Sequence, residues 1–239
     1  MNKILGISGS LRNIRYDEGS DLLIEEINQI ETKKHLLEYL EVQGQFCLGA
    51  FVEPNREKEQ SFDKIFRDLK KNSGNRGLSN TECFLASALW GAKMDGAEID
   101  HVSLSDFFFD ELGKTQNLDV LFDKVQNADG IMLSSPVYFG DRGSLSHSFL
   151  TILRKQEKNS VKGKFFAGIT AGAKRNGGQE TCLIYKMQDF MELGMLGLGN
   201  DSLTTAQYGG TGHAGDIGTA AKDEYGLNTS IGTGKRMAE

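Results

Sequence analysis

Short apolar runs recur along the chain, separated by longer stretches in which apolar residues return at helical spacing. Three of the runs, Lys3–Ser8, Gly130–Ser134 and Lys164–Thr170, have the length and apolar content of buried strands. Glu98–Leu104 alternates apolar and polar residues and predicts another strand, and Met195–Thr205 predicts a weaker one. The pattern therefore predicts five strands.

Four helices are predicted between these strands. Thr81–Asp95 has its apolar residues at helical spacing, and Leu118–Asn127 is amphipathic. Ser144–Arg154 and Gln179–Leu193 are the other two. Strands joined by helices of this length form the crossover units of a parallel sheet. We therefore expect an α/β fold, a flavodoxin-like doubly wound five-stranded parallel sheet of order 2-1-3-4-5, whose ligand lies beyond the carboxyl ends of the strands.

The segment 13–77 interrupts this pattern between the first strand and the first crossover helix. It has 65 residues, where a connection from strand to helix normally has a handful. Asp21–Val42 and Lys58–Lys71 are plausible helices within it. We therefore expect one flavodoxin-like domain over residues 1–239, with a large helical insertion after the first strand at 13–77.

Composition and charge narrow the classes of partner. Of the 239 residues, 38% are hydrophobic and 25% charged, which suits a packed core of ordinary size. The formal net charge of −6 argues against a nucleic-acid partner, because neutralising a phosphate backbone takes clustered Lys and Arg. No apolar run reaches the roughly 18 residues that span a bilayer, and the amino-terminal stretch lacks a signal-peptide pattern. We expect a cytoplasmic protein with no membrane contact.

Cysteine and histidine form no recognisable metal site in the sequence. Cys47, Cys83 and Cys182 are far apart and make neither a CxxC pair nor a disulfide framework. The four His residues show no metal-ligand spacing. We therefore expect no bound metal.

Two polar segments flank the insertion and are candidates for an anion site. Ser8–Arg12 (SGSLR) follows the first strand directly, where backbone N–H groups, hydroxyls and the Arg12 guanidinium can bind a phosphate. Ser79–Glu82 (SNTE) opens the first crossover helix with residues that either cap a helix or bind a phosphate there. Alone, each segment is equally consistent with a tight turn or a plain capping box. Together they favour a phosphate site.

Two further segments end the third and fourth predicted strands. Ser134–Gly140 (SSPVYFG) would place two aromatic residues at the rim of the sheet, where a ring system can stack. Thr170–Glu180 (TAGAKRNGGQE) exposes backbone groups that can hydrogen-bond the polar edge of a heteroaromatic ring. The alternatives are a turn whose aromatic residues pack on a helix and an ordinary glycine-rich loop.

These four segments, in this order and each at the carboxyl end of a strand or the start of a helix, resemble the NADPH-dependent FMN reductase family of flavodoxin-like flavoproteins. The resemblance implies that the first two segments hold the FMN phosphate and that the other two flank the isoalloxazine ring. It points to these cofactor-binding residues: Ser8, Ser10, Arg12, Ser79, Asn80 and Thr81 for the phosphate, and Pro136, Val137, Tyr138, Phe139, Gly172, Gly177, Gly178 and Gln179 for the ring. It implies no catalytic acid or base, because the chemistry belongs to the cofactor.

One branch of that family carries an iron–sulfur cluster on a compact group of cysteines after the second strand. The corresponding segment here, Ser103–Asn117, contains no cysteine. A cluster needs several thiolates, so the resemblance is to the branch without one.

The resemblance implies an enzyme that passes hydride from NADPH or NADH to flavin N5, and electrons from there to a small-molecule acceptor. The alternatives are a flavodoxin-like electron-transfer or flavin-binding protein without NAD(P)H turnover, and a binding module without flavin. Members of the family commonly form dimers or tetramers, and the run Phe107–Phe109 offers apolar surface for a core or an interface. We therefore expect a homodimer or homotetramer.

Overall fold

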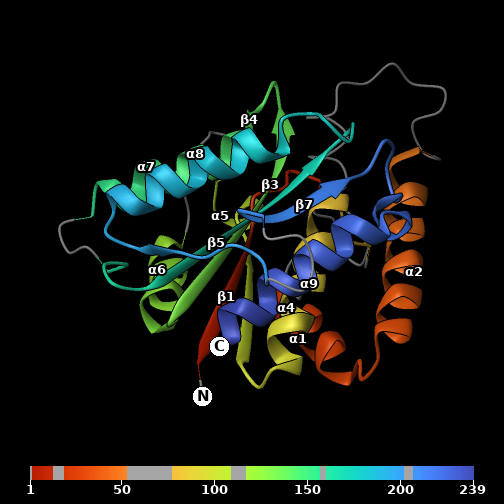
Figure 1. Cartoon of the computed structure of the whole chain (residues 1–239), viewed down its shortest axis with the longest axis horizontal. Coiled ribbons are helices and arrows are strands. Elements are labelled where there is room, and N and C mark those ends of the chain that lie inside the picture. Colours follow the sequence, from red (N-terminus) through yellow and green to blue (C-terminus); the bar gives the residue numbers. More distant parts are fainter. Residues whose placement is uncertain (1, 13–18, 53–76, 109–116, 157–159, 202–206) are drawn as a thin grey trace.

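A parallel β-sheet runs through the molecule and carries helices on both faces (Figure 1). The computed structural model describes residues 2–12, 19–52, 77–108, 117–156, 160–201 and 207–239. The centre of the sheet has the order β2-β1-β3-β5, and all its pairings are parallel. These strands are β1 (Lys3–Ser8), β2 (Glu98–Ser103), β3 (Gly130–Tyr138) and β5 (Phe165–Gly172). The first four predicted strands are confirmed.

Two short strands fill the fifth position of the sheet. β6 (Leu196–Gly197) pairs with the start of β5, and β7 (Gly209–His213) pairs with its end. The predicted order 2-1-3-4-5 therefore agrees with the structure, but the predicted extent of the fifth strand, 195–205, is wrong. The main part lies in β7, which has no apolar run because its glycines make room for neighbours. A Cβ atom on Gly212 would lie 2.2 Å from the ring of Phe84.

Side chains from the carboxyl-terminal region bind the outer edge of β7. The Thr211 N–H donates to Thr229 Oγ1 at 3.1 Å, and the His213 N–H donates to Asp223 Oδ2 at 2.6 Å. Thr229 lies on α9 (Glu224–Ala238), and Asp223 immediately precedes that helix. These side chains satisfy backbone donors that an adjacent strand would otherwise bind.

The helices divide the core into two clusters, one on each face of the sheet. One face is covered by α6 (Leu118–Asn127), α7 (Ser144–Arg154) and α8 (Gln179–Glu192). The other is covered by α4 (Asn80–Met94) together with α9 and the two helices α1 (Gly19–Gln29) and α2 (Lys33–Val52). Figure 1 shows α7 and α8 on one side of the sheet, with α4 and α9 on the other. The four predicted crossover helices are confirmed to within a residue at either end.

Helix α9 packs against α4 with almost no space between the two backbones. A Cβ atom on Gly234 would lie 1.7 Å from the Ala88 carbonyl oxygen, and one on Gly91 would lie 2.3 Å from the Ile231 carbonyl oxygen. None of the helices predicted from the sequence covers this segment, so α9 was missed. Glycine is unfavourable in a helix interior. Here it permits the close approach of α9 and α4, which buries one side of α9.

Two helices of the predicted insertion lie within the described residues. They are α1 (Gly19–Gln29) and α2 (Lys33–Val52), where a single helix Asp21–Val42 was predicted. The break follows from contacts with α4: the Trp90 Nε1–H donates to the Ile30 carbonyl at 2.9 Å, and Lys93 Nζ donates to the Asn28 and Ile30 carbonyls at 3.0 and 2.9 Å. These donors satisfy the carbonyls that end α1. The predicted helix Lys58–Lys71 lies outside the described residues.

Three short elements complete the described chain: α5 (Ser105–Phe108), β4 (Asp141–Arg142) and the 3-10 helix η2 (Ala220–Lys222). Phe107 packs partly buried beside the core on the α6 face, whereas Phe109 lies outside the described residues. Across the described ranges, the helices all fall short of the length and apolar character needed to cross a bilayer.

Candidate functional site

A cavity of about 140 Å³ opens where the carboxyl ends of β1, β3 and β5 meet. This is the point where the strand order reverses, the usual ligand position in such sheets. Segments predicted from the sequence to bind a cofactor converge here from four separate parts of the chain. The predicted residues that line the cavity are Ser10, Arg12, Ser79, Asn80, Thr81, Pro136, Val137, Tyr138 and Gly172.

Backbone N–H groups of the loop after β1 donate to β3 and to serine hydroxyls of the strand end and the loop. The Gly9 N–H donates to the Ser134 carbonyl at 2.9 Å, which ties the loop to β3. The Ser10 N–H donates to Ser8 Oγ at 3.4 Å, and the Arg12 N–H donates to Ser10 Oγ at 3.1 Å. Ser8 is fully buried and supports the loop from below, so it does not line the cavity.

The start of α4 presents backbone donors to the cavity. Ser79 forms a capping box with Glu82: its Oγ accepts from the Glu82 N–H at 3.3 Å, and the Glu82 carboxylate accepts from the Ser79 N–H at 3.3 Å. The alternative role weighed for this segment, a helix cap, is therefore present. The N–H groups of the next two residues, Asn80 and Thr81, belong to the unpaired first turn of a helix and carry its partial positive charge.

The Asn80 side chain binds the segment that precedes η2. Its Nδ2 donates to the Asp216 carbonyl at 2.7 Å, and its Oδ1 accepts from the N–H groups of Thr219 and Ala220 at 3.1 and 3.2 Å. This side chain therefore organises the cavity wall. If Asn80 binds an anion, its backbone N–H group would donate the hydrogen bond.

Helix α2 and the segment before η2 form a wall that sequence reasoning missed. Cys47 of α2 lines the cavity, together with Ala214 and Ile217. The two parts touch through glycines: a Cβ atom on Gly44 would lie 2.7 Å from the Gly218 carbonyl oxygen. No local motif marks Cys47, because its position depends on how the insertion packs.

The Cys47 thiol is neutral. Burial, and secondarily the negative charge of Glu82, raise the pKa of Cys47 from 9.0 to about 12, while Arg12 lowers it to a smaller extent. A neutral thiol is a poor nucleophile. Cys47 therefore contributes shape and an apolar surface to the cavity.

The β3–β4 turn supplies the aromatic side of the cavity. Ser135 Oγ accepts from the Gly143 N–H at 2.9 Å and holds the turn closed. Tyr138 lines the cavity and is half-exposed. Phe139 does not reach the cavity: its backbone adopts a left-handed φ of 53°, and its side chain is fully exposed to solvent.

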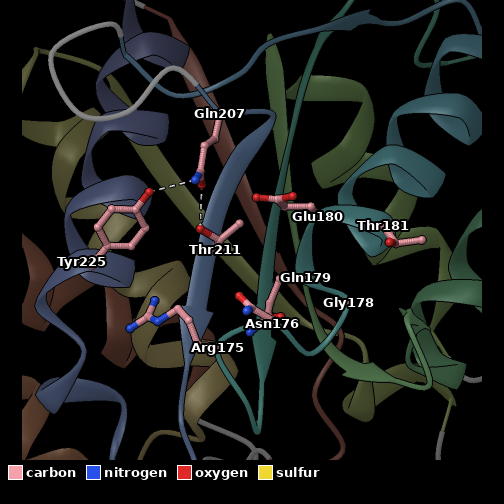
Figure 2. A pocket seen from close by; sticks show the side chains of 9 residues that line it. All are labelled: Arg175, Asn176, Gly178, Gln179, Glu180, Thr181, Gln207, Thr211 and Tyr225. Atoms are coloured by element: carbon pink, nitrogen blue, oxygen red, sulfur yellow. Dashed lines mark hydrogen bonds between the residues drawn. The ribbon is translucent and has the colours of Figure 1, made fainter.

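The loop between β5 and α8 turns away from this cavity after Ala173. Gln179 holds the loop, since its Nε2 donates to the Lys174 carbonyl at 2.6 Å and its Oε1 accepts from the Gly177 N–H at 2.8 Å. Gly178 and Gln179 line a second cavity of about 670 Å³ beside β7, shown in Figure 2. Of the four residues predicted from this loop, only Gly172 lines the first cavity.

The first cavity has the donor set of a phosphate site at one end and apolar and aromatic groups at the other. Hydroxyls of Ser10 and Thr81, the Arg12 guanidinium and the start of α4 are suited to a dianion. Val137, Tyr138 and Ala171 line the remaining wall and are suited to a flat ring. These lining groups match the chemistry of a phosphorylated aromatic cofactor such as FMN.

The chain has sequence relatives among known proteins. The profile of the NADPH-dependent FMN reductase family matches residues 72–209. An iron-sulfur flavoprotein of Methanocaldococcus jannaschii is 33% identical over 181 residues, which covers 69% of this chain and 91% of that protein. An iron-sulfur flavoprotein of Methanosarcina thermophila is 27% identical over 180 residues, covering 67% of this chain and 87% of that protein.

Solved structures agree on the fold. RosB, in a crystal structure with a bound 8-demethyl-8-formylriboflavin-5′-phosphate intermediate, superposes with a TM-score of 0.56 at 11% identity, covering 100% of this chain and 78% of that one. An oxidoreductase from Corynebacterium diphtheriae superposes with a TM-score of 0.52 at 11% identity, covering 100% and 95%. Both alignments extend beyond the matched family profile, which ends at Gly209, the first residue of β7.

Proposed function

The chain belongs to the NADPH-dependent FMN reductase family, and from this premise we propose that it takes electrons from NADPH or NADH and passes them to a small-molecule acceptor. FMN-dependent oxidoreductase chemistry follows from the family. We place the FMN site at the cavity where the carboxyl ends of β1, β3 and β5 meet. The observation that supports this placement is that groups suited to a phosphate and groups suited to a ring line the same cavity.

At the phosphate end of the proposed site, the chain supplies charge and fixed donors. Arg12 offers a charge-assisted contact, and Ser10 and Thr81 offer hydroxyls. Thr81 is 4% exposed, so its hydroxyl acts where water competes little. The capping box keeps the start of α4 in place, so these donors need little rearrangement when an anion binds.

At the ring end, the chain supplies shape and exclusion of water. Pro136 and Val137 line the cavity from β3, and Gly172 lines it from β5. When bound, FMN supplies hydride and electron transfer at its ring. The residues around the ring bind and orient it, and no side chain is needed as an acid or base.

An iron–sulfur cluster, which the names of the two relatives include, does not fit this chain. Its three cysteines are fewer than the four thiolates that such clusters normally use. All three are buried free thiols, on α2, α4 and α8. No electron path through a cluster is therefore proposed.

Binding of FMN to the purified protein, and its reduction by pyridine nucleotides, test the proposal. We expect FMN to raise the melting temperature, and NADPH or NADH to bleach the flavin absorbance in anaerobic stopped-flow mixing. Failure of FMN to bind would refute the proposed cofactor site. Binding without bleaching by either nucleotide would refute the proposed reductant and leave the electron-transfer alternative.

A pair of threonine variants locates the phosphate. Thr81→Val keeps the shape of a buried side chain but removes its hydroxyl, so we expect the Kd for FMN to rise about tenfold. The Kd for riboflavin, which has no phosphate, should stay unchanged. Thr151→Val on α7, at an exposed position that does not line the cavity, is the control and should bind both flavins as the wild type does.

A further inference from the structure

A lysine lies inside the core, between α8 and the sheet. Lys186 is fully buried, and a Cβ atom on Gly168 of β5 would lie 3.5 Å from its Cδ atom. Its Nζ donates to the Leu133 carbonyl of β3 at 3.1 Å and to the Ile169 carbonyl of β5 at 2.7 Å. A buried ammonium is costly unless an anion compensates its charge. The position therefore calls for a negative partner.

The groups around Lys186 in the described part of the chain do not supply that anion. Burial lowers the pKa of Lys186, while Cys182, one turn earlier on α8, raises it and Arg142 of β4 lowers it to a smaller extent. Burial raises the pKa of the Cys182 thiol, so this group is neutral at pH 7. Arg142 is a cation, and its ion pairs are with Asp141 and Asp189. Among the described residues, Lys186 thus has two carbonyl dipoles but no carboxylate partner.

The amine lies a few residues along two strands from the ring end of the first cavity. Ala171 of β5 lines that cavity and comes two residues after Ile169. Pro136 of β3 also lines it and comes three residues after Leu133. A strand rises about 3.3 Å per residue, so the Lys186 amine lies roughly 7–10 Å from this wall. A unit charge acts over such a distance, because the effective dielectric constant inside a protein is far below that of water.

We propose that the Lys186 ammonium is the countercharge of reduced FMN, and that reduction of the flavin draws a proton onto this amine. The inference rests on the proposed function, because it assumes FMN in the first cavity. Hydride from the nicotinamide brings two electrons and one proton to N5, so the ring gains one negative charge. The balancing proton comes from solvent and adds to the neutral fraction of the amine. Lys186 does not line the cavity, so it acts on the flavin through charge alone.

The protonation equilibrium of the amine falls in a range where it can respond to the flavin. The pKa of Lys186 is lowered to about 8, so charged and neutral forms coexist near that pH in the oxidised protein. A negative charge on the nearby ring favours the ammonium and raises this pKa. Between the two values, reduction therefore takes up one proton more than the hydride brings.

Midpoint potentials of bound FMN, measured from pH 6 to 9.5, test the proposal. Lys186→Met keeps an unbranched apolar side chain but removes the amine. Below about pH 8 we expect a lower potential in Lys186→Met than in the wild type, because the reduced ring loses its countercharge. Above that pH the gap should narrow, because the wild-type amine loses its proton.

The same charge should appear in the binding of the two redox states of FMN. At pH 7 the ratio of the Kd for oxidised FMN to the Kd for reduced FMN should fall about tenfold in Lys186→Met, the effect of a unit charge at ~10 Å with an effective dielectric constant of about 20. A purely structural role of Lys186 would change both Kd values alike and leave the ratio as it is in the wild type.

Lys164→Met is the matched control. Lys164 Nζ also donates to two backbone carbonyls, those of Gln126 and Ala128. It precedes the first residue of β5, at the end of the sheet opposite the cavity. Its removal should leave the potential of bound FMN at the wild-type value throughout the pH range.

Equal potentials in the wild type and Lys186→Met, or a gap that does not narrow above pH 8, would overturn the inference. If Lys186→Met does not fold, the wild type alone decides. Its potential should fall more steeply with pH between about pH 8 and 9 than just below pH 8, and a constant slope would overturn the inference. Failure of FMN to bind would refute the cofactor site as well, whereas these results refute the role of Lys186 alone.

Discussion

Lys186 is a fully buried lysine whose amine binds the backbone of the sheet. Its Nζ donates to the Leu133 carbonyl at 3.1 Å and to the Ile169 carbonyl at 2.7 Å. It thereby joins α8 to β3 and β5, close to where these strands reach the first cavity. Burial lowers the pKa of Lys186 from 10.5 to about 8, because the charged form loses its hydration.

This lowered pKa predicts a dependence of stability on pH with a definite sign. Between about pH 8 and 10.5 the unfolded chain holds a proton on Lys186 that the folded chain has lost, so this group makes stability rise with pH across that window. Below about pH 8 both states are protonated and the contribution is constant. Lys186→Met removes the contribution. We expect the free energy of unfolding of the wild type, measured in urea, to gain on that of the variant as pH rises from 8 to 10.

Buried thiols act in the opposite direction in the same range. Burial raises the pKa of Cys47 to about 12 and also raises the pKa of Cys182, so both make stability fall as pH rises above 9.0. The contribution of Cys47 is common to the wild type and Lys186→Met, so it cancels in the difference between the two proteins. Lys186 lowers the pKa of Cys182, so its removal raises that pKa further and adds to the gain of the wild type on the variant. Parallel stability curves would contradict the buried amine as the cause.

At the scale of elements, α9 depends on glycines that its own helix does not favour. Gly234→Ala would place a Cβ atom against the Ala88 carbonyl oxygen, so we expect a loss of about 1–3 kcal/mol from overpacking, despite the better helix propensity of alanine. Gly49→Ala on α2 is the matched control, because nothing lies within 4 Å of its new Cβ atom. That change should stabilise by about 0.5–1 kcal/mol. Chemical denaturation of both variants checks the prediction, and equal effects would contradict it.

The contact between α2 and the segment before η2 gives the insertion a role at the cavity. Gly44→Ala would push α2 away from Gly218 and loosen the wall that contains Cys47 and Ile217. We expect faster release of FMN, measured by the recovery of flavin fluorescence after dilution. Gly49→Ala, on the same helix, should release FMN at the wild-type rate. An unchanged rate in Gly44→Ala would show that the wall does not retain the cofactor.

At the scale of the whole molecule, the parallel sheet and its crossover helices were predictable, because each strand and each helix has its own local pattern of apolar residues. Apolar runs such as Lys3–Ser8 and the spacing of α4 encode strands and helices within a few residues. The segments that predicted cofactor binding lie at strand ends and helix starts, so one edge of the sheet collects most of them. The local sequence was therefore sufficient to predict the candidate site residues that lie at this edge of the sheet.

The parts that sequence reasoning missed depend on tertiary contacts. β7 and α9 contain glycine where a strand or helix normally has side chains, because Phe84 and α4 occupy that space. The position of Cys47 at the cavity follows from how α2 packs. Phe139, which its motif predicts to bind the ring, does not line the first cavity; its backbone is left-handed and its side chain is exposed.

We propose that the chain forms a homodimer or homotetramer. Exposed apolar side chains on the single chain support this proposal. Tyr138, Phe139 and Met191 are exposed by 48%, 109% and 60%, and an interface between copies of the chain would cover such side chains. Light scattering coupled to size-exclusion chromatography should give two or four times the mass of one chain. A monomer at micromolar concentration would contradict the proposal.

The hydrogen bonds from the edge of β7 to Thr229 and Asp223 also restrict how copies of this chain can associate. Backbone amides that are already bonded cannot pair with a strand from another molecule, so this border of the sheet does not template edge-to-edge growth. A chain shortened before α9 would lose Thr229 and expose the Thr211 amide. Helix α9 thus protects this edge of the sheet from pairing with other molecules, in addition to covering the core.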